Sequence, residues 1–244
     1  MLMVKNIALI LLILFLLPSC SKKEKLSAEL SYIKAMKYLK KKDYTSAAEN
    51  FEKIDDEFPF SKWAMKAKTM AVYARYKDEE YAQILTLVDD FLRLNPNSEY
   101  VPYMIYMKGL SYYNRVPSIE RAQDDTQKAS FTFRELIARF PNDFHSSDAE
   151  KKLHFVDEHL AGSKMSIGRY HIENSNYIGA ITNFKDVIDY YRQTDQVPEA
   201  YFRLTEIYCK IGLKQKGASV FVILRDKFPE NYWTKLAQEV VTRF

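Results

Sequence analysis

The stretch AAENFEKIDDEFP, residues 47–59, carries the pattern that decides the expected fold. It places the small residue Ala47 four positions before Phe51, and Phe58-Pro59 begins seven positions after Phe51. Residues four apart lie on the same face of a helix, so Ala47 would let a neighbouring helix approach while Phe51 fills the seam. Proline cannot continue a helix and disfavours helical geometry in the residue before it. The stretch therefore predicts one packed helix that ends near Phe58.

The same layout recurs four more times, with its large central residue at Val88, Phe133, Phe184 and Phe221. Counted from Phe51, these marker residues are separated by 37, 45, 51 and 37 residues. The residue four positions before each marker is small in four of five cases: Ala47, Ile84, Ala129, Ala180 and Gly217. A recurring period in this range is typical of stacked helical repeats. The alternative is an irregular all-α bundle with accidental Phe-Pro pairs, and five in-phase matches argue against it.

A second set of markers precedes these helices, with Ala35 and Tyr38 before the first and Gly109 and Tyr112 before the third. This alternation resembles the tetratricopeptide repeat, whose period is about 34 residues. We therefore expect an all-α, tetratricopeptide-like α-solenoid of about five helix pairs. The expected repeats cover residues 28–60, 61–97, 98–142, 146–195 and 197–230. A C-terminal capping helix, or alternatively a docking face for a partner, is expected from the apolar spacing of Tyr232, Trp233, Leu236, Val240 and Phe244.

Three departures from the repeat predict local differences. Arg192 replaces the proline of the fourth repeat, so the end of that helix is expected to be less sharply defined. The longer interval before Phe133 is assigned to a polar loop within residues 114–126, which contains Pro117. An uninterrupted apolar stripe predicts a single long helix over residues 146–174.

Composition supports helices and argues against several functions. The chain has 244 residues, of which 47% are hydrophobic and 14% aromatic, with only six glycines and eight prolines. The net charge of +4 is too small to imply nucleic-acid binding. Two of its four histidines, His154 and His159, are five apart and lie on different sides of a helix. No metal-binding, nucleophile or phosphate-binding motif is present, so we expect no enzyme, no metal and no cofactor.

The beginning of the chain resembles a bacterial lipoprotein leader. Lys5 is followed by an unbroken apolar run over residues 7–17, which is too short to span a bilayer. The run leads to Leu17-Pro18-Ser19-Cys20, which resembles a lipobox whose cysteine becomes acylated. We expect a signal peptide at residues 1–19, a lipidated Cys20 in a Lys-rich linker at residues 20–27, and one repeat domain at residues 28–244. The other cysteine, Cys209, is expected to be a small buried apolar residue.

The combination of lipobox, short linker and repeats resembles the BamD family of outer-membrane assembly lipoproteins. The local segments that carry this resemblance are Phe58-Pro59-Phe60-Ser61, residues 90–96 (DFLRLNP) and residues 103–110 (YMIYMKGL). The resemblance implies a non-enzymatic scaffold, lipid-anchored at the periplasmic face of the outer membrane. Its implied partners are a BamA-type barrel subunit, other lipoproteins of the complex and unfolded outer-membrane proteins.

The resemblance also indicates where two kinds of contact would lie. The C-terminal repeats would contact the BamA-type subunit, but Pro198 stands where the family has its contacting arginine, which leaves Arg203 as the candidate. The N-terminal repeats would receive substrate targeting segments. Helical spacing assigns the inner, concave face to five groove candidates: Tyr32, Met36, Leu39, Tyr73 and Tyr76. For each of them, packing between helices is the alternative.

Two other functions remain open on the sequence. One is a tetratricopeptide-type envelope lipoprotein that acts as an adaptor in cell-wall or division coordination. The other is a hydrolase whose site is assembled from residues distant in the sequence.

Overall fold

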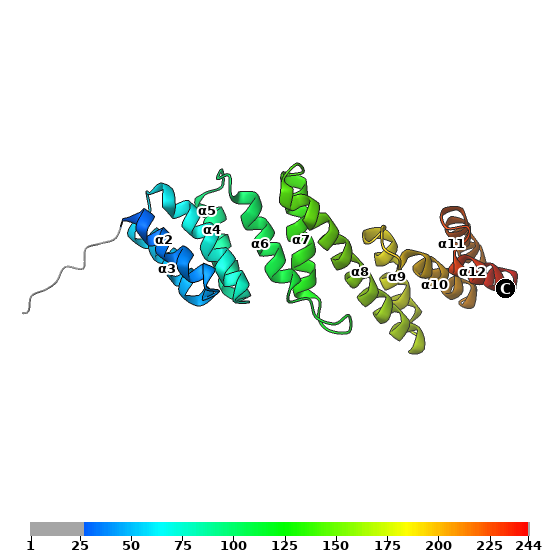
Figure 1. Ribbon diagram of the computed structural model, residues 1–244. Coiled ribbons are helices and arrows are strands. Elements are labelled where there is room, and N and C mark those ends of the chain that lie inside the picture. Colours follow the sequence, from blue (N-terminus) through cyan, green and yellow to red (C-terminus); the bar gives the residue numbers. More distant parts are fainter. Residues whose placement is uncertain (1–26, 244) are drawn as a thin grey trace, which may run out of the picture.

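The computed structural model describes residues 27–243, which form eleven α-helices and no strand. Consecutive helices are antiparallel neighbours and stack into an elongated array (Figure 1). The helices are α2 Ala28–Lys40, α3 Tyr44–Glu57, α4 Lys62–Lys77, α5 Tyr81–Leu94, α6 Val101–Tyr113, α7 Asp124–Arg139, α8 Phe144–Glu173, α9 Tyr177–Tyr190, α10 Val197–Lys210, α11 Lys214–Lys227 and α12 Tyr232–Arg243. We call the first helix of each pair its A helix and the second its B helix. The expected α-solenoid of five helix pairs with a final helix is confirmed.

The five markers lie in the B helices, and every one is buried. Phe51, Val88, Phe133 and Phe184 have no exposed surface, and Phe221 is 6% exposed. The small residues four positions earlier are also buried. In two pairs an A-helix glycine lies directly against the marker ring, Gly109 against Phe133 and Gly168 against Phe184. The markers therefore fill the seam between the two helices of a pair.

All five B helices end in the same geometry. The residue after each helix has φ between −121° and −138°, and its N–H donates to the carbonyl four residues earlier. These C-cap residues are Phe58, Asn95, Phe140, Tyr191 and Phe228. The repeated cap turns the chain back toward the next A helix at one edge of the array.

The expectation that the end of α9 would be less sharply defined is wrong. Without a proline at position 192, Tyr191 still caps α9 and donates to the carbonyl of Val187 at 3.0 Å. Its side chain packs against both of the larger core clusters, and its carbonyl accepts from the Thr194 hydroxyl at 2.8 Å. Packing and this turn hydrogen bond fix the helix end, so the proline is dispensable there.

The long helix and the long loop lie where the sequence places them. Helix α8 is continuous over 30 residues, from Phe144 to Glu173, and packs against both α7 and α9. Residues 114–123 form the connection between α6 and α7. The interval of 51 residues therefore comes from an extended A helix, and the interval of 45 comes from a loop.

Helix α12 covers the last pair, as a capping helix should. Ala237 is fully buried in the C-terminal core cluster, and Trp233, Leu236 and Val240 pack against it. No helix within residues 27–243 combines the length and apolar character needed to cross a membrane. The leader, Cys20 and the linker up to residue 26 lie outside the described residues, as does Phe244.

Candidate functional site

A cluster of tyrosines joins three successive A helices at the centre of the array. Tyr73 and Tyr76 come from α4, Tyr103 and Tyr106 from α6, and His145 from the first turn of α8. The His145 ring lies 5.5 Å from the Tyr103 ring and 5.0 Å from the Tyr106 ring. Tyr103 interacts electrostatically with Tyr73, and Tyr106 with Tyr76 and Tyr103, so these side chains form one polar aromatic surface. We call it the tyrosine cluster.

An acidic group fixes the α6–α8 side of the tyrosine cluster. The Tyr106 hydroxyl donates to Asp148 Oδ2 at 2.5 Å, and Lys152 Nζ lies 3.4 Å from the same oxygen. Burial, followed by this hydrogen bond, raises the pKa of Tyr106 far above its ordinary value. Burial alone would raise the pKa of Asp148, but the bonds from Tyr106 and Lys152 hold it below its usual value. At neutral pH the cluster therefore presents neutral hydroxyls beside a charged carboxylate.

The outer part of the cluster remains open to solvent. Tyr73 is 39% exposed, whereas Tyr76 is partly buried. The Tyr76 hydroxyl accepts from Asn114 Nδ2 at 3.0 Å, and its ring packs against Tyr81. Of these two groove candidates, Tyr73 is thus free to touch a ligand and Tyr76 is held by its neighbours.

The three candidates from α2 pack mainly between helices. The Tyr32 ring lies 5.3 Å from Phe51 and 4.9 Å from Trp63. Met36 and Leu39 are partly buried against the N-terminal core cluster. Lysines flank the edge of this region, with Lys62 and Lys66 about equally close to the Trp63 ring, at 5.7 and 5.6 Å. The structure brings Tyr32 next to Trp63 but not into the tyrosine cluster.

Four members of this face were not among the sequence candidates: Tyr103, Tyr106, His145 and Asp148. The pair Tyr103 and Tyr106 has the same three-residue spacing as Tyr73 and Tyr76, which is the signal that could have found them. Nothing in the local sequence marks His145 or Asp148, because their role depends on the packing of α8 beside α6.

Arg203 lies in a second charged site that links α8 and α10. Its Nε donates to Glu199 at 3.2 Å and its Nη1 to Glu206 at 3.1 Å, and Arg169 also reaches Glu199, at 3.3 Å. The guanidinium lies over the rings of Phe202 and Trp233, at 5.2 and 5.7 Å. Arg203 is one-quarter exposed, so it is held in place and still presents a face to solvent.

The remaining candidates for chemistry lie apart from each other. Pro198 is buried in the first turn of α10. Cys209 is buried, as expected, and burial raises the pKa of its thiol. Within residues 27–243, no group of three or more His, Cys, Asp or Glu side chains is arranged to hold a metal ion.

An array of stacked helix pairs belongs to the class of tetratricopeptide-like repeat proteins. Among solved structures, the TPR2AB-domain:pHSP90 complex of yeast Sti1 is similar, with a TM-score of 0.44. Its sequence identity is 13%, over 88% of this chain and 82% of that chain.

Sequence comparison identifies the family more specifically than the fold does. Residues 24–220 match the YfiO family, described as "Outer membrane lipoprotein". The outer membrane protein assembly factor BamD of Rickettsia prowazekii is 32% identical over 84% of this chain and 82% of its own length. The protein of the same name from Caulobacter vibrioides is 31% identical, over 86% of this chain and 69% of its own. The chain belongs to the BamD family of outer-membrane protein assembly factors.

Proposed function

We propose that this protein is a non-enzymatic scaffold of the complex that assembles β-barrel proteins into the outer membrane. It binds the BamA-type barrel subunit through its C-terminal pairs and receives unfolded barrel proteins on its inner face. Membership of the assembly-factor family across most of the chain is the observation that carries the proposal. The tyrosine cluster and the Arg203 site give it a physical basis, because they lie on different helices of the array.

The C-terminal contact is assigned to the charged site around Arg203. Arginine is favoured where a carboxylate of a partner must be recognised, and the cation–π contacts already orient this guanidinium. A partner carboxylate would compete with Glu206, whose side chain is 38% exposed. The site thus takes over the role of the arginine that Pro198 replaces.

Co-purification tests this assignment. From detergent-solubilised envelopes, the tagged full-length chain should recover a large barrel subunit, and Arg203→Ala should lower recovery about tenfold, because a charge pair at an interface is lost. Arg139→Ala is the control, since Arg139 lies on α7, outside the C-terminal pairs, its side chain is 46% exposed, and it pairs with Glu135 of its own helix. Recovery of division or peptidoglycan proteins without a barrel subunit would favour the adaptor function instead.

The inner face is assigned to extended segments that end in an aromatic residue. Exposed Tyr73 can stack on such a ring, and the neutral hydroxyls beside it can pair with peptide groups. The flanking lysines near Trp63 would attract a terminal carboxylate.

Peptide binding tests the inner face. A fluorescent ten-residue peptide with a C-terminal phenylalanine should bind the full-length chain, and Tyr73→Ala should weaken binding about five- to tenfold, the usual loss for an aromatic contact. Tyr190→Ala on α9, where the ring is 72% exposed, should leave binding unchanged. Equal affinity for a peptide that lacks the terminal phenylalanine would contradict the assignment.

Membrane attachment is assigned to an acylated Cys20. Each buried CH₂ of an acyl chain contributes about 0.8 kcal/mol, so two or more chains anchor a protein stably. Fatty-acid labelling in cells should be lost in Cys20→Ala and kept in Cys209→Ala.

A further inference from the structure

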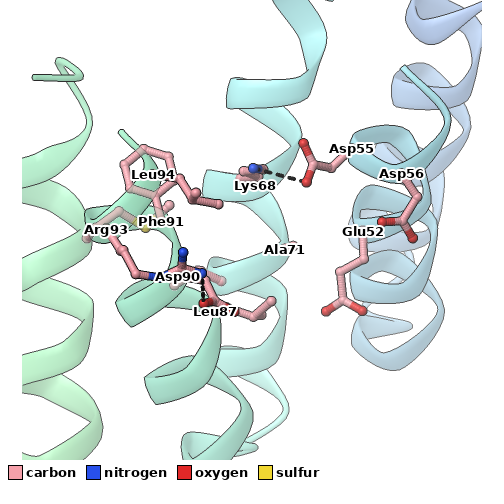
Figure 2. Close-up of a pocket in the computed structure, with 12 residues that line it drawn as sticks. Glu52, Asp55, Asp56, Lys68, Ala71, Leu87, Asp90, Phe91, Arg93 and Leu94 are labelled. Atoms are coloured by element: carbon pink, nitrogen blue, oxygen red, sulfur yellow. Dashed lines mark hydrogen bonds and ion pairs between the residues drawn. The ribbon is translucent and has the colours of Figure 1, made fainter. Parts of the chain in front are cut away.

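A recess lies between the first and second helix pairs. Helices α3 and α5 form its walls and α4 its floor, and it encloses about 380 Å³ (Figure 2). Its lining residues are Glu52, Asp55, Asp56, Lys68, Ala71, Val72, Leu87, Asp90, Phe91, Arg93, Leu94 and Met104. None of them belongs to the tyrosine cluster or to the Arg203 site. We call this recess the α3–α5 cleft.

The interior of the α3–α5 cleft is apolar. Ala71, Val72, Phe91 and Met104 are almost fully buried beneath it, while Leu94 at the end of α5 is 60% exposed. The volume is near the lower end of the range for ligand pockets, about 300–1,000 Å³. The cleft can therefore take up an aliphatic side chain, and it is small for a whole peptide or a cofactor.

The rim of the cleft is acidic from both sides. Figure 2 shows Glu52, Asp55 and Asp56 on the α3 wall and Asp90 on the α5 wall. Four carboxylates and two cations, Lys68 and Arg93, thus line the cleft, and Glu52 is in addition paired with Arg75 of α4. Lys68 pairs with Asp55 at 3.0 Å, and Arg93 pairs with Asp90 at 2.7 Å.

These internal pairs leave the Asp56 carboxylate without a cation and the Asp90 carboxylate only weakly paired. Arg93 and Asp90 have side chains that are 66% and 58% exposed, so their pair is solvated and weak. Asp56 is exposed and has no ion-pair partner among the residues that the structure describes. A cation from outside can therefore pair with Asp56 or replace Arg93 at Asp90 at little cost.

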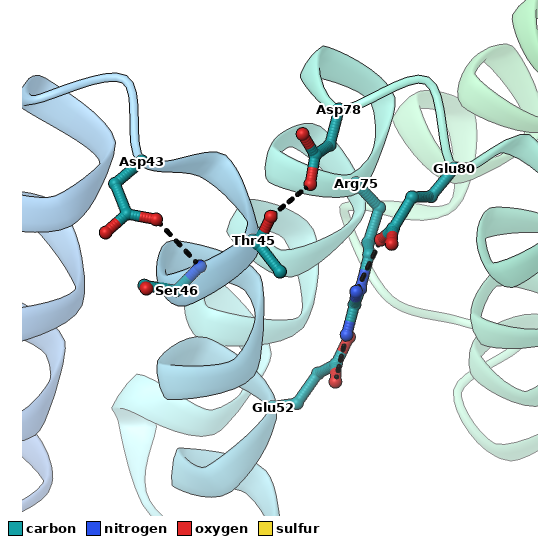
Figure 3. Close-up of polar contacts among 7 residues, drawn as sticks. All are labelled: Asp43, Thr45, Ser46, Glu52, Arg75, Asp78 and Glu80. Carbon is teal, nitrogen blue, oxygen red and sulfur yellow. Dashed lines mark hydrogen bonds and ion pairs between the residues drawn. The ribbon is translucent and has the colours of Figure 1, made fainter.

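A partly buried arginine, Arg75, holds the lower part of the α3 wall. Arg75 on α4 donates from Nε and Nη2 to the two oxygens of Glu52, at 2.9 and 3.0 Å, and from Nη1 to Glu80 (Figure 3). The hydrogen bond to Glu52 is the main cause that raises the pKa of Arg75 above its ordinary value. Thr45 of α3 also donates to Asp78 after α4, at 2.6 Å. These bonds link α3 to α4, and α4 to the residue that precedes α5.

We propose that the α3–α5 cleft is a docking site for an arginine side chain, flanked by apolar residues, from a partner protein. The methylene stem would lie on Leu87 and Leu94, and the guanidinium would pair with a rim carboxylate, Asp56 or Asp90. A planar guanidinium can bind one carboxylate through two parallel hydrogen bonds, whereas lysine is a point charge.

A defined probe tests the proposal on the full-length chain in detergent micelles. Acetyl-Leu-Arg-Leu-amide should shift the methyl NMR signals of Leu87, Leu94 and Met104, with saturation at a Kd of about 1 mM or lower. The double variant Asp56→Asn/Asp90→Asn should weaken binding at least fivefold. Asp226→Asn on α11, where the carboxylate is 59% exposed, is the matched control and should not change it.

The comparison peptides decide whether the site is what we propose. Acetyl-Leu-Glu-Leu-amide and the norleucine analogue should bind at least fivefold more weakly than the arginine peptide. Equal binding of either one, shifts confined to methyl groups outside the cleft, or no saturation with the arginine peptide would overturn the proposal. Because the assay uses the isolated chain, its failure would leave the co-purification test of the scaffold function standing.

Discussion

Phe184→Ala is expected to lower the free energy of unfolding by about 3–5 kcal/mol, the usual cost of removing a fully buried phenylalanine ring. Phe184 has no exposed surface, and it fills the seam between α8 and α9. The A-helix backbone approaches this ring at Gly168, so neither helix can move in to close the cavity without losing other packing. Urea unfolding followed by circular dichroism measures the loss.

The matched control is Phe131→Ala on α7. That ring is 72% exposed, so its removal should change the free energy of unfolding by less than about 0.5 kcal/mol. The damage from Phe184→Ala should also be local, since Phe184 belongs to the C-terminal core cluster together with Phe202 and Phe221. Hydrogen exchange should accelerate in α8 to α12 and remain near normal in α2 to α5. A near-neutral effect of Phe184→Ala would contradict the role of the ring in the seam.

The repeat was predictable because its signal lies in the spacing of residues within one helix. A small residue, an aromatic residue four positions later and a helix stop all belong to the same helix. Ala47, Phe51 and Phe58 therefore predict the first packed seam, and the equivalent residues predict the others. The end of α9 was not predictable by this rule. There the stop depends on how Tyr191 packs between two core clusters, which involves residues far away in the sequence.

The recognition surfaces were predictable only in part. Tyr73 and Tyr76 were found from helical spacing, but their neighbours Tyr106 and Asp148 lie on helices about 30 and 70 positions further on. The bond between those two side chains depends on the crossing of α6 and α8. The α3–α5 cleft gives no signal in the sequence, because acidic residues on a helix most often lie on its solvated face. It occurs beside the pair whose marker is Val88 instead of phenylalanine.

Gly168→Ala and Gly162→Ala, two identical changes in the same helix, are expected to have opposite signs. A Cβ atom at Gly168 would lie 2.5 Å from Cε1 and 2.7 Å from Cζ of Phe184, closer than carbon atoms can approach. The ring is fully buried and must shift, which costs about 1–3 kcal/mol and outweighs the gain in helix propensity. At Gly162 the nearest atom is Cγ2 of Ile119 at 3.7 Å, an ordinary contact. Gly162→Ala should therefore stabilise the protein by about 0.5–1 kcal/mol.

The two seam predictions are coupled, and this coupling can be measured. In the Phe184→Ala background the new methyl group at position 168 would enter the cavity left by the ring, so the clash disappears. The double variant should be more stable than the sum of the single losses predicts, by about 1–2 kcal/mol, as is found for residues in direct contact. Urea unfolding of the four proteins in this cycle gives the coupling energy. Additive losses, or a stabilising effect of Gly168→Ala alone, would show that α8 and α9 do not approach each other at this position.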